Sequence, residues 1–221
     1  KFTIQLEPGA EGIDAATDIE VAALPPKAQK ALGKAIEALK ANKPGDARNA
    51  LETASRLAPK SAEVQFMYGV YEQQTGNGSQ ARSYWTKSLE LYPQHFRSLI
   101  SLSESLLQEN KAAEALPYLQ RAVRTEPSSW RAHALSAEAS LKQGSLEEAI
   151  QAAEGKVGLM LELKARGMTD RLNEAMMRIG FAGRLIYASF FHDDLRQLRH
   201  IQPKAQALAL IVGRPVQPAS F

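Results

Sequence analysis

The sequence contains no cysteine, which excludes disulfides, thiolate metal sites and cysteine nucleophiles. It also lacks an uninterrupted apolar run near the roughly 18–20 residues of a membrane-spanning helix. A late candidate, ALALIVG at 207–213, is far too short. No basic-plus-apolar signal segment opens the chain. Because the first residue is Lys1 rather than Met, we expect a fragment or a processed product, and an export signal or a preceding domain is left open.

Sequence motifs for catalysis and for metal binding are absent as well. The TGNGS stretch at 75–79 lacks the lysine and the strand context of a phosphate-binding loop, and no serine stands in a nucleophile-elbow sequence. His192 and His200 are eight residues apart, which separates them by about 12 Å along a helix, too far for one metal ion. We therefore predict no enzyme activity, no catalytic residues, no metal, no cofactor and no small-molecule substrate.

Net charge is small, but it is unevenly distributed. The formal net charge is +3, and the hydrophobic content of 44% and the charged content of 23% are ordinary for a globular domain. Residues 1–24 hold one basic and five acidic side chains, whereas residues 155–221 hold ten basic and five acidic ones. Either the acidic head and the basic tail attract each other, or the tail meets an anionic partner. A solvated helix face is the more ordinary interpretation.

What the sequence does contain is a regular repeat. Prolines recur at a fixed interval, at Pro59, Pro93 and Pro127. Alanines recur at the same interval, at Ala47, Ala81, Ala115 and Ala149. Between successive prolines the pattern predicts two helices, and the intervening NKPGD, TGNGS, QENKA and KQGSL are typical of turns between helices. Each proline ends the second helix of one unit, and the next helix starts just beyond it.

A fixed period of about 34 residues with two helices per unit resembles the tetratricopeptide-repeat family. The resemblance covers about residues 28–158 and implies an all-α, right-handed superhelical solenoid of four helix-turn-helix repeats. Small residues are expected where the two helices of a unit cross, and Gly69 and Ala81 supply them in the second unit, with the larger Trp85 four residues later. One unit cannot bury enough apolar area to offset its ordering, so the stacked units are expected to fold together.

The period also predicts the domain organisation. The predicted segments are an extended or strand-like linker at 1–24, four repeats within 25–158 (about 28–61, 62–95, 96–129 and 130–163), a helical cap at 159–212 and a disordered tail at 213–221. The last repeat is expected to be extended, because Lys156 stands where a small residue would fit the pattern.

The N-terminal segment KFTIQLE alternates apolar and polar residues, which predicts a strand. Two interpretations are open. The strand is the end of a β-domain missing upstream, as in the bacterial extracytoplasmic proteins that this arrangement resembles, or the segment folds back onto the repeats. The first interpretation favours an extracytoplasmic bacterial location; the sequence otherwise leaves the compartment unknown.

In the tetratricopeptide-repeat family the first helices of successive units line a concave face, so the resemblance implies a partner-binding groove there. The side chains predicted to line this groove are Leu32, Ile36, Phe66, Val70, Gln73, Arg97, Ile100, Glu104, Arg131 and Glu138. An exposed apolar strip that grades into charge suits an amphipathic helix or an extended apolar peptide. The carboxylate clamp of chaperone-binding members is not expected, because only Arg97 of its five positions is retained. Coverage of the strip by the chain's own ends or by a second copy is the competing interpretation.

The sequence therefore predicts a non-catalytic protein–protein interaction scaffold that binds a peptide or a partner helix, with a homo-oligomer as a further option. Two alternatives stay open: a basic C-terminal module that recruits an anionic partner (nucleic acid or a membrane surface), and a regulatory domain of an enzyme on a missing segment. Aromatic residues such as Phe181 and Tyr187 lie among the tail arginines, as in single-strand binders. These aromatic side chains also suit the apolar core of a cap, and repeat arrays need caps at their ends. Nucleic acid or a membrane is therefore not the expected partner.

Overall fold

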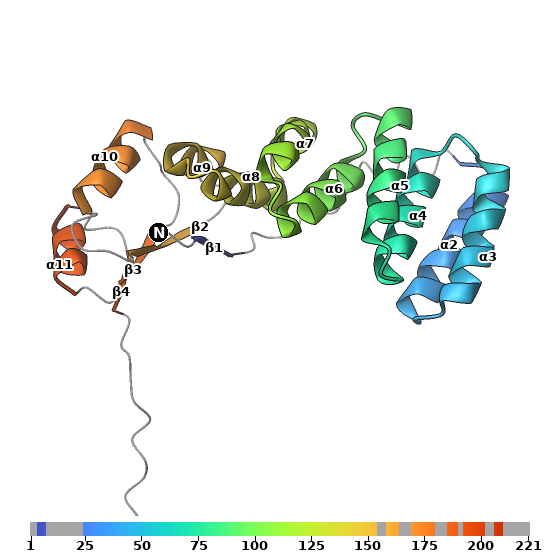
Figure 1. The fold of residues 1–221 in the computed structure, drawn as a ribbon, viewed down its shortest axis with the longest axis horizontal. Coiled ribbons are helices and arrows are strands. Elements are labelled where there is room, and N and C mark those ends of the chain that lie inside the picture. Colours follow the sequence, from blue (N-terminus) through green and yellow to red (C-terminus); the bar gives the residue numbers. More distant parts are fainter. Residues whose placement is uncertain are drawn as a thin grey trace, which may run out of the picture.

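The computed structural model describes residues 4–7, 24–153, 158–163, 169–179, 185–189, 192–201 and 206–209. Its main part is a row of four antiparallel helix pairs (Figure 1). The pairs are α2 (Pro26–Lys40) with α3 (Pro44–Leu57), α4 (Ala62–Gln74) with α5 (Gly78–Leu91), α6 (Phe96–Gln108) with α7 (Ala112–Thr125), and α8 (Trp130–Lys142) with α9 (Leu146–Ala153). The predicted helical solenoid of four repeats is confirmed. Among the described residues, no helix is both long and apolar enough to span a bilayer.

The ends of the helices follow the same repeat period. The side chains of Ser61, His95 and Ser129 each cap the first helix of a unit by accepting a hydrogen bond from the backbone N–H three residues later. After that helix the chain turns through a residue with positive φ, which asparagine and glycine adopt at least cost. These residues are Asn42, Gly76, Asn110 and Gly144, with φ of 52°, 87°, 59° and 82°.

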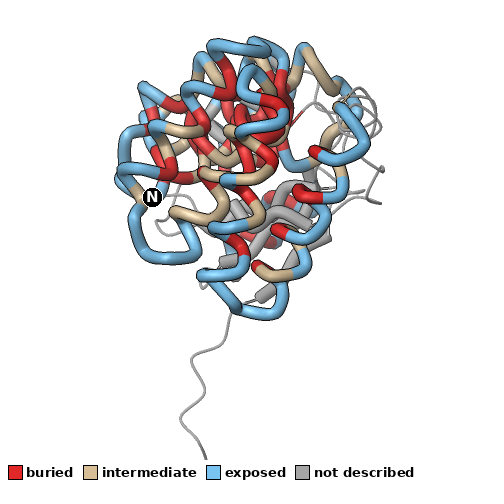
Figure 2. The backbone as a smooth tube through the Cα atoms, turned by 90° about the vertical axis from the view of Figure 1, so that its right-hand side faces the viewer, coloured by how far each residue is buried: buried red, intermediate tan, exposed pale blue. Residues whose placement is uncertain are grey.

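Small residues allow the two helices of each unit to cross closely. Ala47, Ala81, Ala115 and Ala149 are all fully buried. In the second unit the indole of Trp85 lies directly against Gly69: a Cβ at Gly69 would stand 2.2 Å from Trp85 Nε1. Figure 2 shows the result, in which buried residues run through the inside of the row while the turns are exposed. One continuous apolar cluster extends from Ala28 in the first unit to Ala139 in the fourth.

The prediction of an all-helical cap at 159–212 is wrong, because this part of the chain contains strands as well as two helices. Its helices are α10 (Thr169–Ile179) and α11 (His192–Ile201), and its strands are β2 (Gly158–Leu163), β3 (Leu185–Ser189) and β4 (Gln206–Ala209). The three strands are parallel neighbours in the order β2-β3-β4, joined through α10 and α11. Parallel strands need such crossover connections, so the helices serve as links between strands, and α11 also packs against β3 and β4.

The prediction that the fourth unit extends as helix to residue 163 is wrong. Helix α9 ends at Ala153, and residues 158–163 form β2. Two physical reasons favour the strand. Glycine at 158 is a poor helix former, and β2 has a hydrogen-bonding neighbour on each side, β1 and β3, so that its backbone groups are paired without a helix.

The strand predicted near the N-terminus lies at Ile4–Glu7 (β1) and pairs antiparallel with β2, Ile4 opposite Leu161. Its partner strand is therefore in this chain. The four repeats are inserted between two neighbouring strands of one sheet, with the sheet at one end of the row and the α2–α3 pair at the other (Figure 1). The predicted linker beyond Glu7 and the predicted tail at 213–221 lie outside the described residues.

Candidate functional site

The predicted groove residues come from the first helices of the four units, α2, α4, α6 and α8, but they differ in exposure. Leu32, Phe66 and Ile100 are only 2%, 4% and 3% exposed. Ile36 and Val70 are half-buried. The expected strip of exposed apolar side chains is therefore wrong, because three of its five apolar members, Leu32, Phe66 and Ile100, belong to the core cluster that joins successive units.

Phe66 shows how a residue on the expected face becomes buried. The guanidinium carbon of Arg97, in the next unit, lies 4.2 Å from the centroid of its ring, and the ring of His95 lies 5.3 Å away. A guanidinium over an aromatic face is attractive. The third unit therefore covers the apolar side chain of the second.

A buried polar network fixes this junction. Glu63 accepts a hydrogen bond from Arg97 (Nη1 to Oε1, 2.8 Å), and its other oxygen lies 3.0 Å from His95 Nε2. The chain of contacts continues from His95 Nδ1 to Ser98 Oγ (2.8 Å) and from Ser98 Oγ to Ser88 Oγ (2.8 Å). The Glu63 side chain is only 2% exposed, and burial of a charged carboxylate is costly unless it is paired in this way. Arg97 thus stabilises the solenoid from within the predicted groove.

Glu63 was not predicted from the sequence as the partner of Arg97, although the repeat period contains a signal for this pair. The two residues are one repeat period apart, so they occupy the same position in consecutive units with opposite charge. The charged end of the predicted groove is likewise paired within the chain. Arg131 donates to Glu104 Oε1 from Nη2 at 2.6 Å and from Nε at 2.9 Å. Lys142 Nζ lies 3.7 Å from Glu138 Oε1.

A hollow remains on this face between α4 and α6. Its volume is about 370 Å³. Its lining residues are Val70, Gln73, Gln74, Trp85, Ser101, Glu104, Ser105 and Gln108. Val70, Gln73 and Glu104 were predicted to line the groove, and the structure brings these three together. Six of these eight lining residues are polar, and this differs from the apolar strip that was expected.

Two of the lining residues, Gln74 and Ser105, were missed because they lie beside the expected face and not on it. They also hold the walls of the hollow in place. Gln74 donates to the carbonyl of Leu39 in the first unit at 3.0 Å. Arg82 in α5 donates to Ser105 Oγ at 3.2 Å and also pairs with Glu109. Hydrogen bonds to neighbouring helices therefore fix both walls.

Across the part of the chain that the structure describes, no group of three or more histidine or acidic side chains is placed to hold a metal ion. The ring nitrogens of the buried His95 and His133 contact polar groups of the chain. His95 lies against Ser98 and Glu63, and His133 has Nδ1 2.6 Å from the Ala152 carbonyl and Nε2 3.1 Å from the Pro127 carbonyl.

Comparison with known families places the chain in a class whose architecture matches these helix pairs. The family model for the tetratricopeptide repeat matches residues 32–96, 70–127 and 100–155, which together span 32–155, more than half of the chain. The chain therefore belongs to the tetratricopeptide-repeat family.

Solved structures with the same fold are distant in sequence. MamA from Desulfovibrio magneticus RS-1 (residues 41 to the end) is 21% identical with a TM-score of 0.54, covering 82% of this chain and 94% of its own. YrrB, described as a tetratricopeptide-repeat protein with an unusual peptide-binding site, is 18% identical with a TM-score of 0.52, covering 78% of this chain and 85% of its own. No curated protein matches the chain. At these identities the likeness shows the fold alone.

Proposed function

We propose that this protein is a non-catalytic interaction scaffold that binds an extended peptide segment of a partner protein in the hollow between α4 and α6. The observation that carries the proposal is that two side-chain amides in that hollow have no hydrogen-bond partner among the described residues. Gln73 and Gln108 are exposed, and among the described residues their side chains form no hydrogen bond. A primary amide can donate to one backbone group of a peptide and accept from another.

The remaining lining complements these amides. Val70 is half-buried and Trp85 is largely buried, so they offer apolar contact within the hollow. Glu104 is fixed by Arg131, which leaves it preorganised to accept a further donor. Ligand sites combine apolar contact with a few convergent polar groups in this way.

Comparison with solved structures supports the proposal only in outline. The family to which the chain belongs is one of interaction scaffolds, and YrrB is described as having a peptide-binding site. The burial of Leu32, Phe66 and Ile100 argues against the amphipathic helix or extended apolar peptide that the sequence suggested as a ligand. A polar, extended peptide fits the hollow better.

The alternative of a basic C-terminal recruiting module gains little support. Two of the tail arginines have carboxylate neighbours, Arg178 at 3.8 Å from Glu147 and Arg196 at 3.0 Å from Asp193. Other basic residues of the tail, such as Arg166 and Arg214, lie outside the described residues. A regulatory domain of an enzyme on a further segment is not tested by this structure.

Selection of random dodecapeptides on the full chain, followed by affinity measurement with Gln73→Ala/Gln108→Ala, tests the proposal. Loss of two peptide hydrogen bonds is expected to weaken binding about tenfold. The control is Gln80→Ala/Gln94→Ala, which removes two exposed amides outside the hollow. Peptides that bind the first variant as tightly as the unmodified chain would exclude this hollow as their site.

A further inference from the structure

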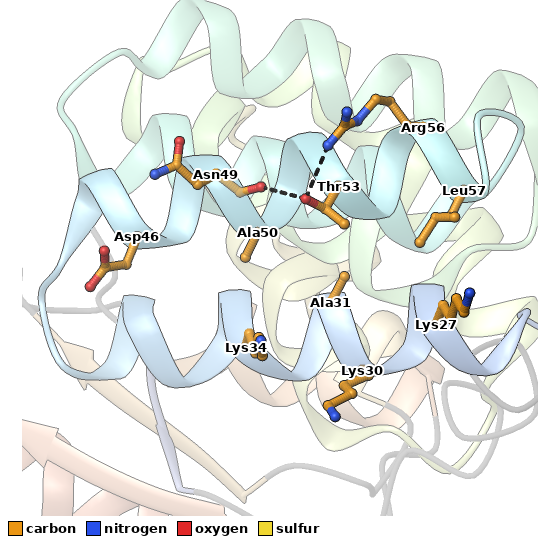
Figure 3. A pocket seen from close by; sticks show the side chains of 10 residues that line it. All are labelled: Lys27, Lys30, Ala31, Lys34, Asp46, Asn49, Ala50, Thr53, Arg56 and Leu57. Atoms are coloured by element: carbon orange, nitrogen blue, oxygen red, sulfur yellow. Dashed lines mark hydrogen bonds between the residues drawn. The ribbon is translucent and has the colours of Figure 1, made fainter.

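A second, larger hollow lies on the outer face of the first unit, between α2 and α3 (Figure 3). Its volume is about 810 Å³. Its lining residues are Lys27, Lys30, Ala31, Lys34, Asp46, Asn49, Ala50, Thr53, Arg56 and Leu57. This surface was not predicted from the sequence, and among the described residues its lining has no member in common with the hollow between α4 and α6.

The repeat period shows what this face does in the other units. The residues that occupy the position of Lys30 in the second, third and fourth units are Val64, Ser98 and Ala132, all fully buried. They are buried at the junctions where the second helix of one unit packs on the first helix of the next: α3 on α4, α5 on α6 and α7 on α8. In the first unit the same position is an exposed lysine.

The junction between the first and second units shows the contact in detail. Tyr68 and Tyr84, which occupy the positions of Lys34 and Ala50 one unit later, stack with their ring centroids 5.0 Å apart. They line one pocket together with Arg48 and Glu52 of α3. Burial, with the nearby Glu52 carboxylate, raises the pKa of Tyr68. At each inner junction this face of a unit therefore receives a helix, and its shape in the first unit suits a helix as well.

The residues on the face of the first unit define the chemistry of such a helix. Lys27, Lys30 and Lys34 are exposed, and within the described ranges none of them forms an ion pair. Arg56 donates to the neutral Thr53 hydroxyl, at 3.5 Å. Of the described residues that line the hollow, Asp46 is the single acidic one. The surface is thus strongly positive and complements carboxylates.

Between the cations the hollow is lined by three apolar side chains, its floor, of which two are alanines. Ala31 is buried, Ala50 is half-buried, and Leu57 is 40% exposed. Figure 3 shows Ala31 on α2 and Ala50 on α3 in the space between the two helices. Small floor residues permit close approach of another helix, as they do within each unit. Among the lining residues that the structure describes there is no aromatic side chain, so stacking of nucleic-acid bases is not provided for.

We propose that the outer face of α2 and α3 docks an acidic amphipathic helix of a partner protein in the place that the preceding helix occupies at the inner junctions. The helix presents a narrow stripe of alanine and leucine to Ala50 and Leu57 and carboxylates to Lys27, Lys30 and Lys34. Charge complementarity selects the partner, and the alanine floor selects a helix over an irregular acidic segment.

The test uses the full chain and a fluorescein-labelled helical peptide of five to six turns built from alanine, leucine, glutamate and glutamine, with alanine and leucine on one stripe. A peptide of the same composition in scrambled order is the comparison. Fluorescence anisotropy is expected to show saturable binding of the striped peptide and binding about tenfold weaker of the scrambled one. Equal binding of the two peptides, or no saturable binding of the striped one, would overturn the proposal.

Two variants separate charge from shape. Lys30→Glu/Lys34→Glu reverses two exposed charges and is expected to weaken binding about tenfold or more. Ala50→Lys adds a positive charge but fills the floor, so binding is expected to fall although the electrostatic attraction rises. Stronger binding to Ala50→Lys would show attraction without docking and would contradict the proposal.

Matched controls keep the result specific to this face. Lys40→Glu/Lys43→Glu makes the same charge change on exposed residues outside the hollow, and affinity is expected to stay within about twofold. Gln73→Ala/Gln108→Ala alters only the α4–α6 hollow, and peptide binding is expected to be unchanged. A loss of binding in either control would contradict the assignment, and the second control also distinguishes failure here from failure of the proposed function.

Other occupants give distinguishable results. If sedimentation shows a dimer that Lys30→Glu/Lys34→Glu dissociates, a second copy is the occupant and the partner proposal is wrong. If neutralising the chain's own acidic residues Glu11, Asp14 and Asp18 tightens peptide binding about tenfold, the N-terminal segment is the occupant, with the same consequence. If single-stranded DNA competes fully with the peptide, charge alone governs the surface, and the helix proposal fails.

Discussion

The junction between the second and third units and the outer face of the first unit are built from the same repeat positions, yet one is closed and the other open. At the inner junction Ser98 is fully buried and takes part in the hydrogen-bonded chain that includes Glu63 and His95. At the outer face the equivalent position, two units earlier, is Lys30, which is exposed. The difference shows that the repeat fixes the backbone shape of a face, while the side chains decide whether a face joins the next unit or stays available.

The close crossing in the second unit gives the largest expected effect on the closed region. Gly69→Ala would place a Cβ 2.2 Å from the buried Trp85 ring, so the indole or the helices must shift. We expect the free energy of unfolding to fall by about 2–3 kcal/mol. Urea denaturation measures this change.

The control for Gly69→Ala is Gly33→Ala, a second helical glycine that lies in the first unit. A Cβ at Gly33 meets nothing within 4 Å, and alanine is the better helix former, so stability is expected to rise by about 0.5–1 kcal/mol. Equal destabilisation by the two changes would show that the crossing at Trp85 is not the tight point of the fold.

The buried carboxylate is the second way to weaken the closed region. Glu63→Gln keeps the shape of the side chain but removes the charge that pairs with Arg97 and His95. We expect a loss of about 2 kcal/mol in unfolding free energy, as for other hydrogen bonds to charged groups. Thermal unfolding at fixed ionic strength checks it.

Glu104→Gln is the matched change at the next junction. Glu104 and its partner Arg131 are much more exposed than Glu63, with side chains 30% and 54% accessible, so the expected loss is below about 1 kcal/mol. A loss as large as that of Glu63→Gln would mean that burial does not distinguish the two pairs.

The fold followed from the sequence wherever the information was local and periodic. The positive-φ residues Asn42, Gly76, Asn110 and Gly144 stand in the predicted turns, and the alanine ladder is buried as the resemblance implied. Local patterns did not reveal the sheet. Strand β1 pairs with β2, which follows only after all four repeats in the sequence, and a short segment such as 158–163 carries too little periodicity to distinguish helix from strand.

The candidate site was predicted only in part, and the reason is again distance along the chain. The position of Phe66 on the first helix of its unit was correct, but its exposure depends on Arg97 and His95 in the next unit. Helical periodicity gives the face on which a side chain lies, and contacts from other units decide what covers that face. The polar hollow and the lysine-lined face both required those contacts to be known.

The smallest expected effect on stability, and the most direct test of the comparison, comes from giving the open face the side chains of the closed one. Lys30→Val/Lys34→Tyr copies Val64 and Tyr68 of the second unit onto the first. The unfolding free energy is expected to change by less than about 0.5 kcal/mol, because both lysines are exposed and unpaired among the described residues.

Association is expected to change instead. The double variant presents an apolar face shaped for a helix, and such a face seeks a partner surface. Sedimentation velocity should show a concentration-dependent increase in mass relative to the unmodified chain. Lys40→Val/Lys43→Tyr, outside the hollow, should not produce it. A variant that sediments like the unmodified chain at every concentration would show that the lysines are not what keeps this face open, and that the backbone of the first unit already differs from that of the inner units.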